Sequence, residues 1–394
     1  MTITRSKVAM LGIAIASPLL AHSQPAPPDA AKPSFTVFGA ANAQFERVSA
    51  TGGAVAAADK PARQRVSNVS SDLGFRGQMP LGNGLSAQFQ YVTGINLDSA
   101  ATAAGLFGSA KDAFVGLGIA NVGVIKFGRL SGAARWNSGT PDFSPAGAGP
   151  QDNQAMLSLV SGQTGAAPAF NARIDNAIGF ESAAWNGLSV RAYYGANEGR
   201  SQAVPSTGAP LSDHTYSLGV RYVLGDLDVR LSFEQREDKG TLNGSTANKT
   251  RDKDYRLGVR YRLFSNTQLA MAADHMSFSD ATATGSAKRG LWRRGWVFGA
   301  RHQMGDHVVY GGFGTAGNVR CSLANGGVCN GEETGARQWV LAYNYLFNRQ
   351  LLAEAFVSRV NNERRARYDF DAGGVAPAVG ANPSAIGAGL RYVF

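Results

Sequence analysis

The side chains that could do chemistry in this chain are mainly arginines, placed at alternate positions in segments of alternating polarity. Leu218, Val220 and Tyr222 share one face of such a segment, and Arg221 lies on the other. Successive side chains of a β-strand point to opposite faces, so this spacing predicts a sheet with guanidinium groups on one side. A water-filled enclosure lined by these groups would attract anions. The same count places on the polar face Arg76, Arg191, Arg230, Arg236, Arg256, Arg260, Arg262, Arg301 and Arg391.

Carboxylates that could oppose these arginines lie in the longest polar segment, residues 131–173. It contains Asp142, in the sequence Pro-Asp-Phe, and Asp152. A segment of this length without regular structure is uncommon in a compact fold and is often functional. The candidate site is a passage between these carboxylates and basic side chains, for which the sequence offers Arg129, Arg135, Arg173 and Arg191. The alternatives are an ordinary surface loop, and arginines that only pair with carboxylates such as Asp228 and Glu234.

Other kinds of chemistry find less support. His275 and Ser277 are the nearest approach to a base and a nucleophile, but they lie where any strand would place them. The five histidines have no metal-ligand spacing. The basic residues are spread over strands instead of clustered, unlike those of nucleic-acid-binding proteins. The sequence therefore predicts no catalysis, no cofactor, no metal site and no nucleic-acid partner.

The amino-terminal residues have the features of a secretory signal. Arg5 and Lys7 precede an apolar run over residues 8–20, and small residues follow at the positions that a signal peptidase reads. This pattern predicts a signal peptide over residues 1–23 and a flexible leader over residues 24–34; a short buried helix is the alternative. Export to an oxidising compartment predicts a local disulfide between the chain's two cysteines, Cys321 and Cys329.

The rest of the chain consists of strand-like segments joined alternately by short turns and by long polar connections. Asn83-Gly84 and Gly225-Asp226 mark two of the short turns. No run of 18 apolar residues follows the amino terminus, which excludes a helical membrane protein. Roughly 16 strands with turns short on one side and long on the other predict an all-β transmembrane barrel over residues 35–394. The long connections span residues 49–67, 97–110, 131–173, 197–213, 237–254, 279–291, 315–336 and 362–382.

The first and last strands carry two further signals. The last residues alternate in polarity and end on Phe394, which suits an aromatic girdle at a membrane interface and an assembly signal. On the first strand, Gly39, Ala41 and Ala43 lie on the outward face, where lipid-facing strands would carry larger apolar residues. Small residues allow another protein surface to approach closely, so they predict a subunit interface; the alternative is that they are simply tolerated there.

Several segments together resemble the trimeric porins of Gram-negative bacteria, of the β-proteobacterial general type. The resemblance covers essentially the whole chain after the signal peptide and implies a 16-stranded antiparallel β-barrel with short periplasmic turns, long extracellular loops and a third loop folded inward. It also implies a homotrimer in the outer membrane. The segments are residues 71–77 (SDLGFRG), 81–90 (LGNGLSAQFQ), 111–117 (KDAFVGL), 126–129 (KFGR), 173–178 (RIDNAI) and 389–394 (GLRYVF).

The chain departs from that family pattern at three positions. Asp72 and Gly179 stand where the resemblance leads us to expect basic residues, and Val92 stands where it leads us to expect an acidic one. The expected function is passive diffusion of small hydrophilic solutes and ions through a water-filled channel, with a preference for anions. The expected partners are outer-membrane lipid, lipopolysaccharide, the barrel-assembly machinery and small anionic or polar solutes. The alternatives are a substrate-specific channel and a plugged structural or adhesive barrel.

Overall fold

β-strands form along almost the whole described chain. The computed structural model describes residues 32–98, 110–160, 163, 170–198, 200, 211–245 and 248–394. The predicted signal peptide, and the predicted leader up to residue 31, lie outside these residues. The strands are β1 (Ser34–Thr51), β2 (Lys60–Asn68), β3 (Asp72–Gly82), β4 (Leu85–Gly94), β5 (Ala110–Ile119), β6 (Gly123–Ser131), β7 (Arg173–Ser182), β8 (Leu188–Gly195), β9 (Thr215–Leu224), β10 (Leu227–Glu237), β11 (Thr250–Phe264), β12 (Thr267–Asp280), β13 (Lys288–Met304), β14 (His307–Ala316), β15 (Arg320–Leu323), β16 (Ala336–Leu346), β17 (Leu351–Asn362) and β18 (Asn382–Val393).

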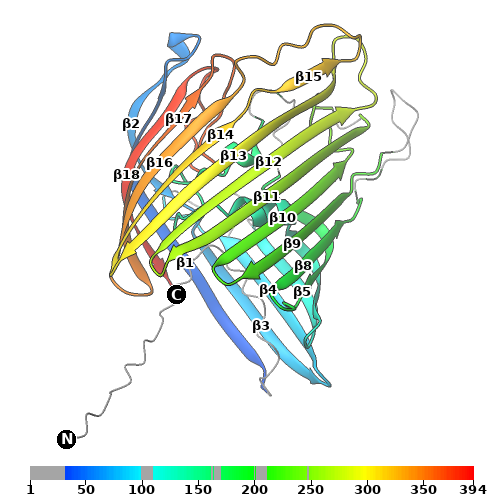
Figure 1. The fold of residues 1–394 in the computed structure, drawn as a ribbon, viewed down its shortest axis with the longest axis vertical. Coiled ribbons are helices and arrows are strands. Elements are labelled where there is room, and N and C mark those ends of the chain that lie inside the picture. Colours follow the sequence, from blue (N-terminus) through cyan, green and yellow to red (C-terminus); the bar gives the residue numbers. More distant parts are fainter. Residues whose placement is uncertain are drawn as a thin grey trace, which may run out of the picture.

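These segments make one closed antiparallel barrel (Figure 1). Neighbours in the chain pair with each other, and β1 pairs with β18 to close the ring. β2 and β3 pair with successive parts of β1, and β14 and β15 pair with successive parts of β13. Each of these two sets is therefore one interrupted strand, so the 18 segments of the sheet form a barrel of 16 strands. The predicted fold class is confirmed.

The two faces of the strands have opposite chemistry. Leu218, Val220 and Tyr222 on β9 are exposed, whereas Ser217 on the other face is fully buried. Apolar groups thus cover the outside of the barrel and polar groups its inside, the reverse of a water-soluble protein and the arrangement that a lipid bilayer requires. The alternation in the sequence predicted this because each strand contacts lipid on one side and the lumen on the other.

The barrel closes at a contact between its first and last strands. Gly39 and Phe394 exchange two backbone hydrogen bonds, with N–O distances of 3.0 and 3.1 Å. A Cβ atom at Gly39 would lie 2.7 Å from the Phe394 ring, so glycine is required for the ring to lie over β1. Gly39 is consequently covered within its own chain, which corrects its place in the predicted small-residue surface; Ala41 and Ala43 stay partly exposed.

Long connections emerge at one end of the barrel and short turns at the other, where the carboxyl terminus also lies (Figure 1). Several strands continue into the connections that the sequence predicted. β1 and β2 occupy much of residues 49–67 around a short 3₁₀ turn, Ala56–Ala58, and β11 and β13 begin before their predicted starts. The polar composition of these extensions hid them, because above the membrane a strand needs no apolar face.

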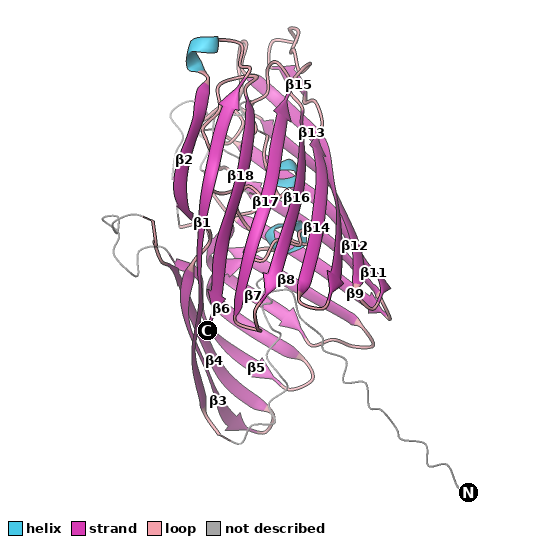
Figure 2. Ribbon diagram, turned by 90° about the vertical axis from the view of Figure 1, so that its left-hand side faces the viewer, coloured by secondary structure: helices cyan, strands magenta, loops and turns pink. Residues whose placement is uncertain are grey.

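Two loops fold back into the barrel. Loop 3 (residues 132–172) carries the helices α1 (Ala133–Ser138) and α2 (Ala155–Ser158), which lie inside the ring of strands (Figure 2). Loop 8 (residues 363–381) packs on it: Tyr368 and Phe370 share a buried cluster with Met156 and Leu157. The sequence predicts the inward third loop, whereas for residues 362–382 it predicts a long connection and gives no sign that this loop also folds inward. Within the described chain, no helix combines the length and the apolar character that crossing a membrane demands.

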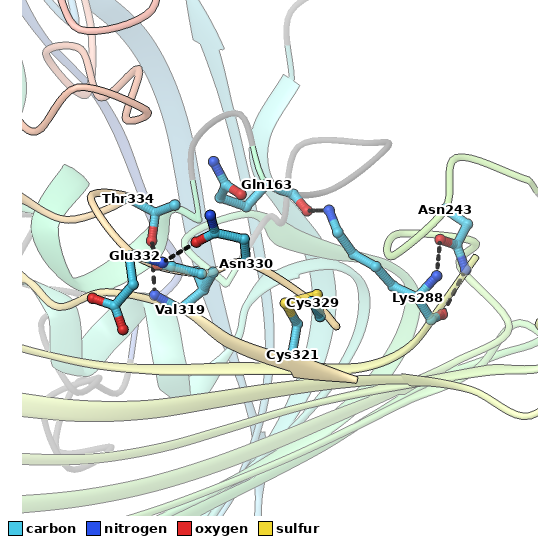
Figure 3. The surroundings of a disulfide bond; sticks show 10 residues. Gln163, Asn243, Lys288, Val319, Cys321, Cys329, Asn330, Glu332 and Thr334 are labelled. Carbon is cyan, nitrogen blue, oxygen red and sulfur yellow. Dashed lines mark hydrogen bonds between the residues drawn. A yellow bond between two sulfur atoms is a disulfide. The ribbon is translucent and has the colours of Figure 1, made fainter. Parts of the chain in front are cut away.

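The predicted disulfide is present at the edge of the long-loop end (Figure 3). Cys321 on β15 is bonded to Cys329 in the connection that follows, with a Cα–Cα distance of 5.6 Å. Nearby, the Lys288 ammonium group donates a hydrogen bond to the backbone oxygen of Gln163 in loop 3. The disulfide therefore closes a short loop beside the strands without crossing the barrel.

Candidate functional site

Loop 3 is fixed to the inner wall by buried arginines. On β11, Arg256 donates hydrogen bonds to the backbone oxygens of Ala134 and Leu157, each 2.9 Å long. On β13, Arg293 donates to the backbone oxygen of Leu159 at 2.8 Å. Both guanidinium groups are almost completely buried, so these carbonyls replace the water that a charged group would otherwise need. The prediction that Arg256 lines the lumen is wrong: it points inward, but loop 3 covers it.

Each of these arginines also has a buried carboxylate on the wall. Arg256 lies 3.2 Å from Asp254, and Arg293 lies 3.2 Å from Asp274. A buried ion pair is tolerated only when most of its donors and acceptors are satisfied. The loop carbonyls supply part of that satisfaction, so the ion pairs and the position of loop 3 depend on each other.

Polar side chains hold the middle part of the loop in the same way. Arg260 on β11 donates to the backbone oxygens of Gly139 and Thr140, the latter at 2.7 Å. Gln338 on β16 donates to the backbone oxygen of Asp152 at 2.8 Å. Arg260 is predicted to line the lumen, and in the structure it supports the loop from the inner wall.

Glycines on the inner wall give loop 3 its close approach. A Cβ atom at Gly295 would lie 2.6 Å from the backbone oxygen of Met156. At Gly299 it would overlap the backbone oxygen of Pro141, and at Gly258 the side-chain oxygen of Asn137. Glycine weakens a strand, and in this barrel it leaves the space that the backbone of another segment occupies.

The two predicted carboxylates of loop 3 are buried. Asp142 accepts hydrogen bonds from the backbone N–H and the hydroxyl of Ser144, at 2.8 and 3.1 Å. Asp152 accepts two from Gln154, at 2.7 and 2.9 Å. Burial raises the pKa of the Asp142 carboxyl to about 6, and burial together with the charge of Asp142 raises the pKa of Asp152 well above its ordinary value. The two carboxylates expected on the acidic face of the passage are thus shielded from water, and they take up protons at a higher pH than exposed carboxylates do.

Asp371 brings loop 8 into the same electrostatic neighbourhood. Its carboxylate accepts a hydrogen bond of 2.6 Å from the side chain of Asn171 in loop 3. Burial raises the pKa of the Asp371 carboxyl, and its charge in turn raises the pKa values of Asp142 and Asp152. Loops 3 and 8 therefore share one group of carboxylates that the sequence could not bring together.

Arginines gather on the inner wall beneath loop 3, close to the short turns. Arg221 and Arg230 face each other across β9 and β10, and both bond to the carboxylate of Asp228. Arg191 on β8 has no carboxylate in ion-pair contact among the described residues, and neither has Arg301 on β13, which donates to Gln303 at 2.8 Å. We call the group formed by Arg191, Arg221, Arg230 and Arg301 the arginine belt.

Trp136 of loop 3 joins the loop to this belt. Its ring lies 3.9 Å from the guanidinium carbon of Arg191 and 4.8 Å from that of Arg230. Stacking on an aromatic face holds a guanidinium group while leaving N–H groups at its edge for an anion. Gly219, opposite Arg191 in the register, allows this approach because a Cβ atom there would lie 2.8 Å from the Arg191 side chain.

A second basic group lies between loop 3 and the wall of β5 and β7. Arg173 forms an ion pair of 2.5 Å with Asp112, and Lys111 forms one of 2.8 Å with Asp72. Arg135 donates to the backbone oxygen of Asn171, and burial and the charge of Arg173 lower its pKa. Arg135 and Arg173 are thus near each other, and the carboxylates of the wall compensate part of their charge.

A groove of about 260 Å³ opens beside β7, and its lining is balanced in charge. Its charged lining residues are Arg173, Arg236, Lys239, Asp175, Glu198 and Asp213. Cations and carboxylates are equally represented in this lining, so the groove has no excess of positive charge, unlike the arginine belt.

Of the remaining predicted residues, two do not line the passage. Arg129 shares the face of the exposed Phe127 and forms an ion pair with Asp175, which corrects its predicted place in the constriction. Arg391 faces inward but is buried, so it does not line an open lumen either. Arg76 points inward near the short-turn end and stacks on Phe38 at 5.0 Å. Alternation gives the correct face for Arg391 and Arg76, and it also places Arg129 outward, on the face of Phe127.

Sequence reasoning missed several residues of the site. Trp136 and Arg293 carried no motif, and their roles depend on contacts between loop 3 and strands that are distant in sequence. The glycines of β11 and β13 did offer a signal, since Gly258, Gly295 and Gly299 alternate with apolar outward residues. Their inward position predicts that another backbone lies against the wall.

Comparison with known proteins agrees with this geometry. The sequence matches the Gram-negative porin family over residues 8–365, so the chain belongs to that family and lies in the outer membrane. It is 32% identical to an outer membrane porin of Bordetella pertussis over 168 residues, a match that spans 41% of each protein. The family and the fold point to a channel rather than an enzyme.

Solved structures share the fold. An anion-selective porin from Comamonas acidovorans superposes with a TM-score of 0.73 and 21% sequence identity, covering 92% of this chain and all of that one. OmpT of Vibrio cholerae, in a trimer form, gives a TM-score of 0.64 at 14% identity and covers 92% of this chain and 99% of its own. At these identities the likeness establishes the barrel architecture alone.

Proposed function

We propose that this porin forms a water-filled channel for passive diffusion of small hydrophilic solutes and prefers anions. The observation that carries the proposal is the arginine belt: among the described residues, its four guanidinium groups have one carboxylate in ion-pair contact, that of Asp228, which pairs with Arg221 and Arg230. The anion selectivity of the Comamonas porin with the same fold supports it. The belt attracts anions, while loop 3 limits solute size by narrowing the lumen.

The passage works by asymmetry of charge across the barrel. Buried carboxylates of loop 3 contribute little negative potential when they are protonated, whereas guanidinium groups stay charged throughout the usable pH range. Arg191 and Arg301 keep donors for a passing anion, and Trp136 holds Arg191 in place. An anion is thus guided along fixed donors without being bound tightly, as conduction requires.

Assembly and maturation complete the proposal. We propose that residues 1–23 are removed on export, that residues 24–34 lead into the barrel, and that residues 131–173 act as the constriction loop. A homotrimer would form over the outward face around Ala41 and Ala43, and the trimer form of OmpT supports this state. Phe394 would be read by the barrel-assembly machinery, and lipopolysaccharide would surround the barrel in the outer leaflet.

Single-channel recording in a planar bilayer with a potassium chloride gradient tests this function. We expect conductance in steps of three and a reversal potential of anionic sign. In the double variant Arg191→Gln and Arg301→Gln, the anion-over-cation permeability ratio should fall several-fold because the two unpaired charges of the belt are lost. Arg359→Gln, an outward arginine on β17, should leave the ratio unchanged.

Four results would revise the proposal. A cation-selective wild-type channel would remove the anion preference, and single steps would remove the trimer. A protein that inserts but never conducts would be a plugged barrel. Equal effects of the belt variants and of Arg359→Gln would show that the selectivity arises elsewhere.

The packing of loop 8 favours a narrow, substrate-specific channel as the second candidate. Tyr368 is fully buried and donates a hydrogen bond of 3.3 Å to the backbone oxygen of Leu159 in loop 3. Two inward loops leave less lumen than one. If the channel is specific, conductance should saturate with one class of solute, and Tyr368→Ala should weaken that saturation; Val379→Ala, an exposed change in the same loop, should not.

A further inference from the structure

The outer surface near the long-loop end carries an unusual row of polar side chains. In the register of β11, β12 and β13, Leu257, Ala273 and Trp296 lie side by side and form an apolar row. One step nearer the long loops, Tyr255, His275 and Arg294 lie side by side. The apolar surface of the barrel therefore ends at this level on β11, β12 and β13, three strands that lie side by side in the barrel wall (Figure 1).

The next row adds two more cations around a tryptophan. Lys253, Ser277 and Trp292 are aligned, and Arg320 on β15 lies opposite Trp292. The guanidinium carbon of Arg320 is 4.9 Å from the Trp292 ring and that of Arg294 is 5.9 Å from it. The His275 ring lies 5.7 Å from the same tryptophan. We call these residues the outer cationic cluster: Lys253, His275, Trp292, Arg294 and Arg320.

In the described part of the chain, no carboxylate pairs with the cations of this cluster. Among the described residues, Lys253, Arg294 and Arg320 take part in no ion pair and no side-chain hydrogen bond. Arg251, the next outward residue of β11, is by contrast paired with Glu237 at 2.7 Å. Three neighbouring cations directed away from the lumen cannot act on permeating solutes, and they contact whatever surrounds the barrel.

The depth of the cluster restricts what that partner can be. A cation on the lipid face is least unfavourable at the interface, where headgroups and water begin, and aromatic side chains mark the same level. Arginine binds phosphate with two parallel hydrogen bonds, and clusters of basic residues attract anionic headgroups. The long loops lie outside the cell in this family, so the cluster lies in the outer leaflet.

We propose that the outer cationic cluster is a binding site for the phosphate group of an outer-leaflet glycolipid, with Arg294 and Arg320 as the main ligands and Lys253 beside them. Trp292 holds both guanidinium groups and contacts the upper end of the acyl region. The site gives the proposed lipopolysaccharide contact a defined position, and it is independent of the anion preference. It also lies away from β1, the proposed subunit interface.

Titration of the folded protein in nonionic detergent with diphosphoryl lipid A tests this site. Bound lipid is counted by native mass spectrometry, and tryptophan fluorescence follows the titration. We expect the triple variant Lys253→Gln, Arg294→Gln and Arg320→Gln to bind at least tenfold more weakly than the wild type, and we expect high salt to reduce the difference. Arg359→Gln is the matched control, because it removes an exposed outward arginine three strands away.

The outcomes separate this site from the alternatives. Equal affinity of the triple variant and the wild type would overturn the proposal, and so would an equal loss in Arg359→Gln. If inorganic phosphate at the same phosphate concentration produces the full fluorescence change, the ligand is free phosphate and not a lipid. Single-channel conductance of the triple variant should match that of the wild type, which shows that the barrel is folded.

Discussion

At Asp142 the carboxylate bonds to Ser144 and is otherwise shielded from water, and burial raises its pKa from 3.8 to about 6. The protonated form is therefore favoured in the folded loop. Below pH 3.8 this preference adds on the order of 3 kcal/mol to the free energy of unfolding, and the contribution is lost as the pH rises through 6. Asp152 is shifted in the same direction.

We expect anion preference to increase as the pH falls from 7 to 5, because the loop loses negative charge while the arginine belt stays charged. In Asp142→Asn this pH dependence should be smaller, since the charge is already absent. Reversal potentials at the two pH values measure the effect. Asp226→Asn, an exposed change in the β10 turn, should retain the wild-type profile, and an Asp142→Asn profile identical to wild type would contradict the assignment.

Arg256 is the clearest single support of loop 3. Arg256→Ala would leave the buried Asp254 without its partner and two loop carbonyls without a donor. We expect a loss of roughly 3–5 kcal/mol in the free energy of unfolding and noisier conductance. Denaturant unfolding gives the first value. Arg251→Ala on the outer face of the same strand removes an exposed ion pair and should cost less than about 1 kcal/mol.

Strands β11, β13 and β14 act as a seat for loop 3, because their inward glycines leave room for its backbone. Gly299→Ala would place a methyl group against the backbone oxygen of Pro141. The loop would have to move toward the centre of the lumen, so we expect lower single-channel conductance and a stability cost of about 1–3 kcal/mol.

Gly311→Ala is the matched change for this test. A Cβ atom there has its nearest neighbour, the backbone oxygen of Val340, at 3.4 Å, and it does not meet loop 3. Its conductance should equal that of the wild type. If both alanine variants conduct alike, the seat is not what sets the position of the loop.

The closure of the whole barrel depends on the contact between Gly39 and Phe394, which we call the seam. Phe394→Ala keeps the two backbone hydrogen bonds to Gly39 and loses the ring that covers it, whereas deletion of Phe394 loses both. We expect a lower yield of folded, heat-modifiable barrel in Phe394→Ala and a still lower one in the deletion. Equal yields of all three proteins on electrophoresis without boiling would refute both the seam and the assembly signal.

Local patterns were sufficient for much of this molecule. Alternation places four arginines on the inner face: Arg191, Arg221, Arg230 and Arg301. The reason is that a strand between lipid and water is stable only when its charged side chains point to the water. It could not distinguish them from Arg256 and Arg391, which share that face and are buried. Burial depends on which segment lies against the wall, and no local spacing reports that.

The sequence by itself determined the barrel, its strand faces, the inward third loop and the disulfide, because each follows from neighbouring residues or from a family pattern. Only the tertiary structure showed that loop 8 packs on loop 3, that Asp142 and Asp152 are shielded, and that Trp136 holds Arg191. These features arise where segments far apart in the chain share one enclosed volume. Packing in that volume buries some charged groups and leaves others in contact with water. The arginine belt remains in contact with water and forms the charged surface of the channel.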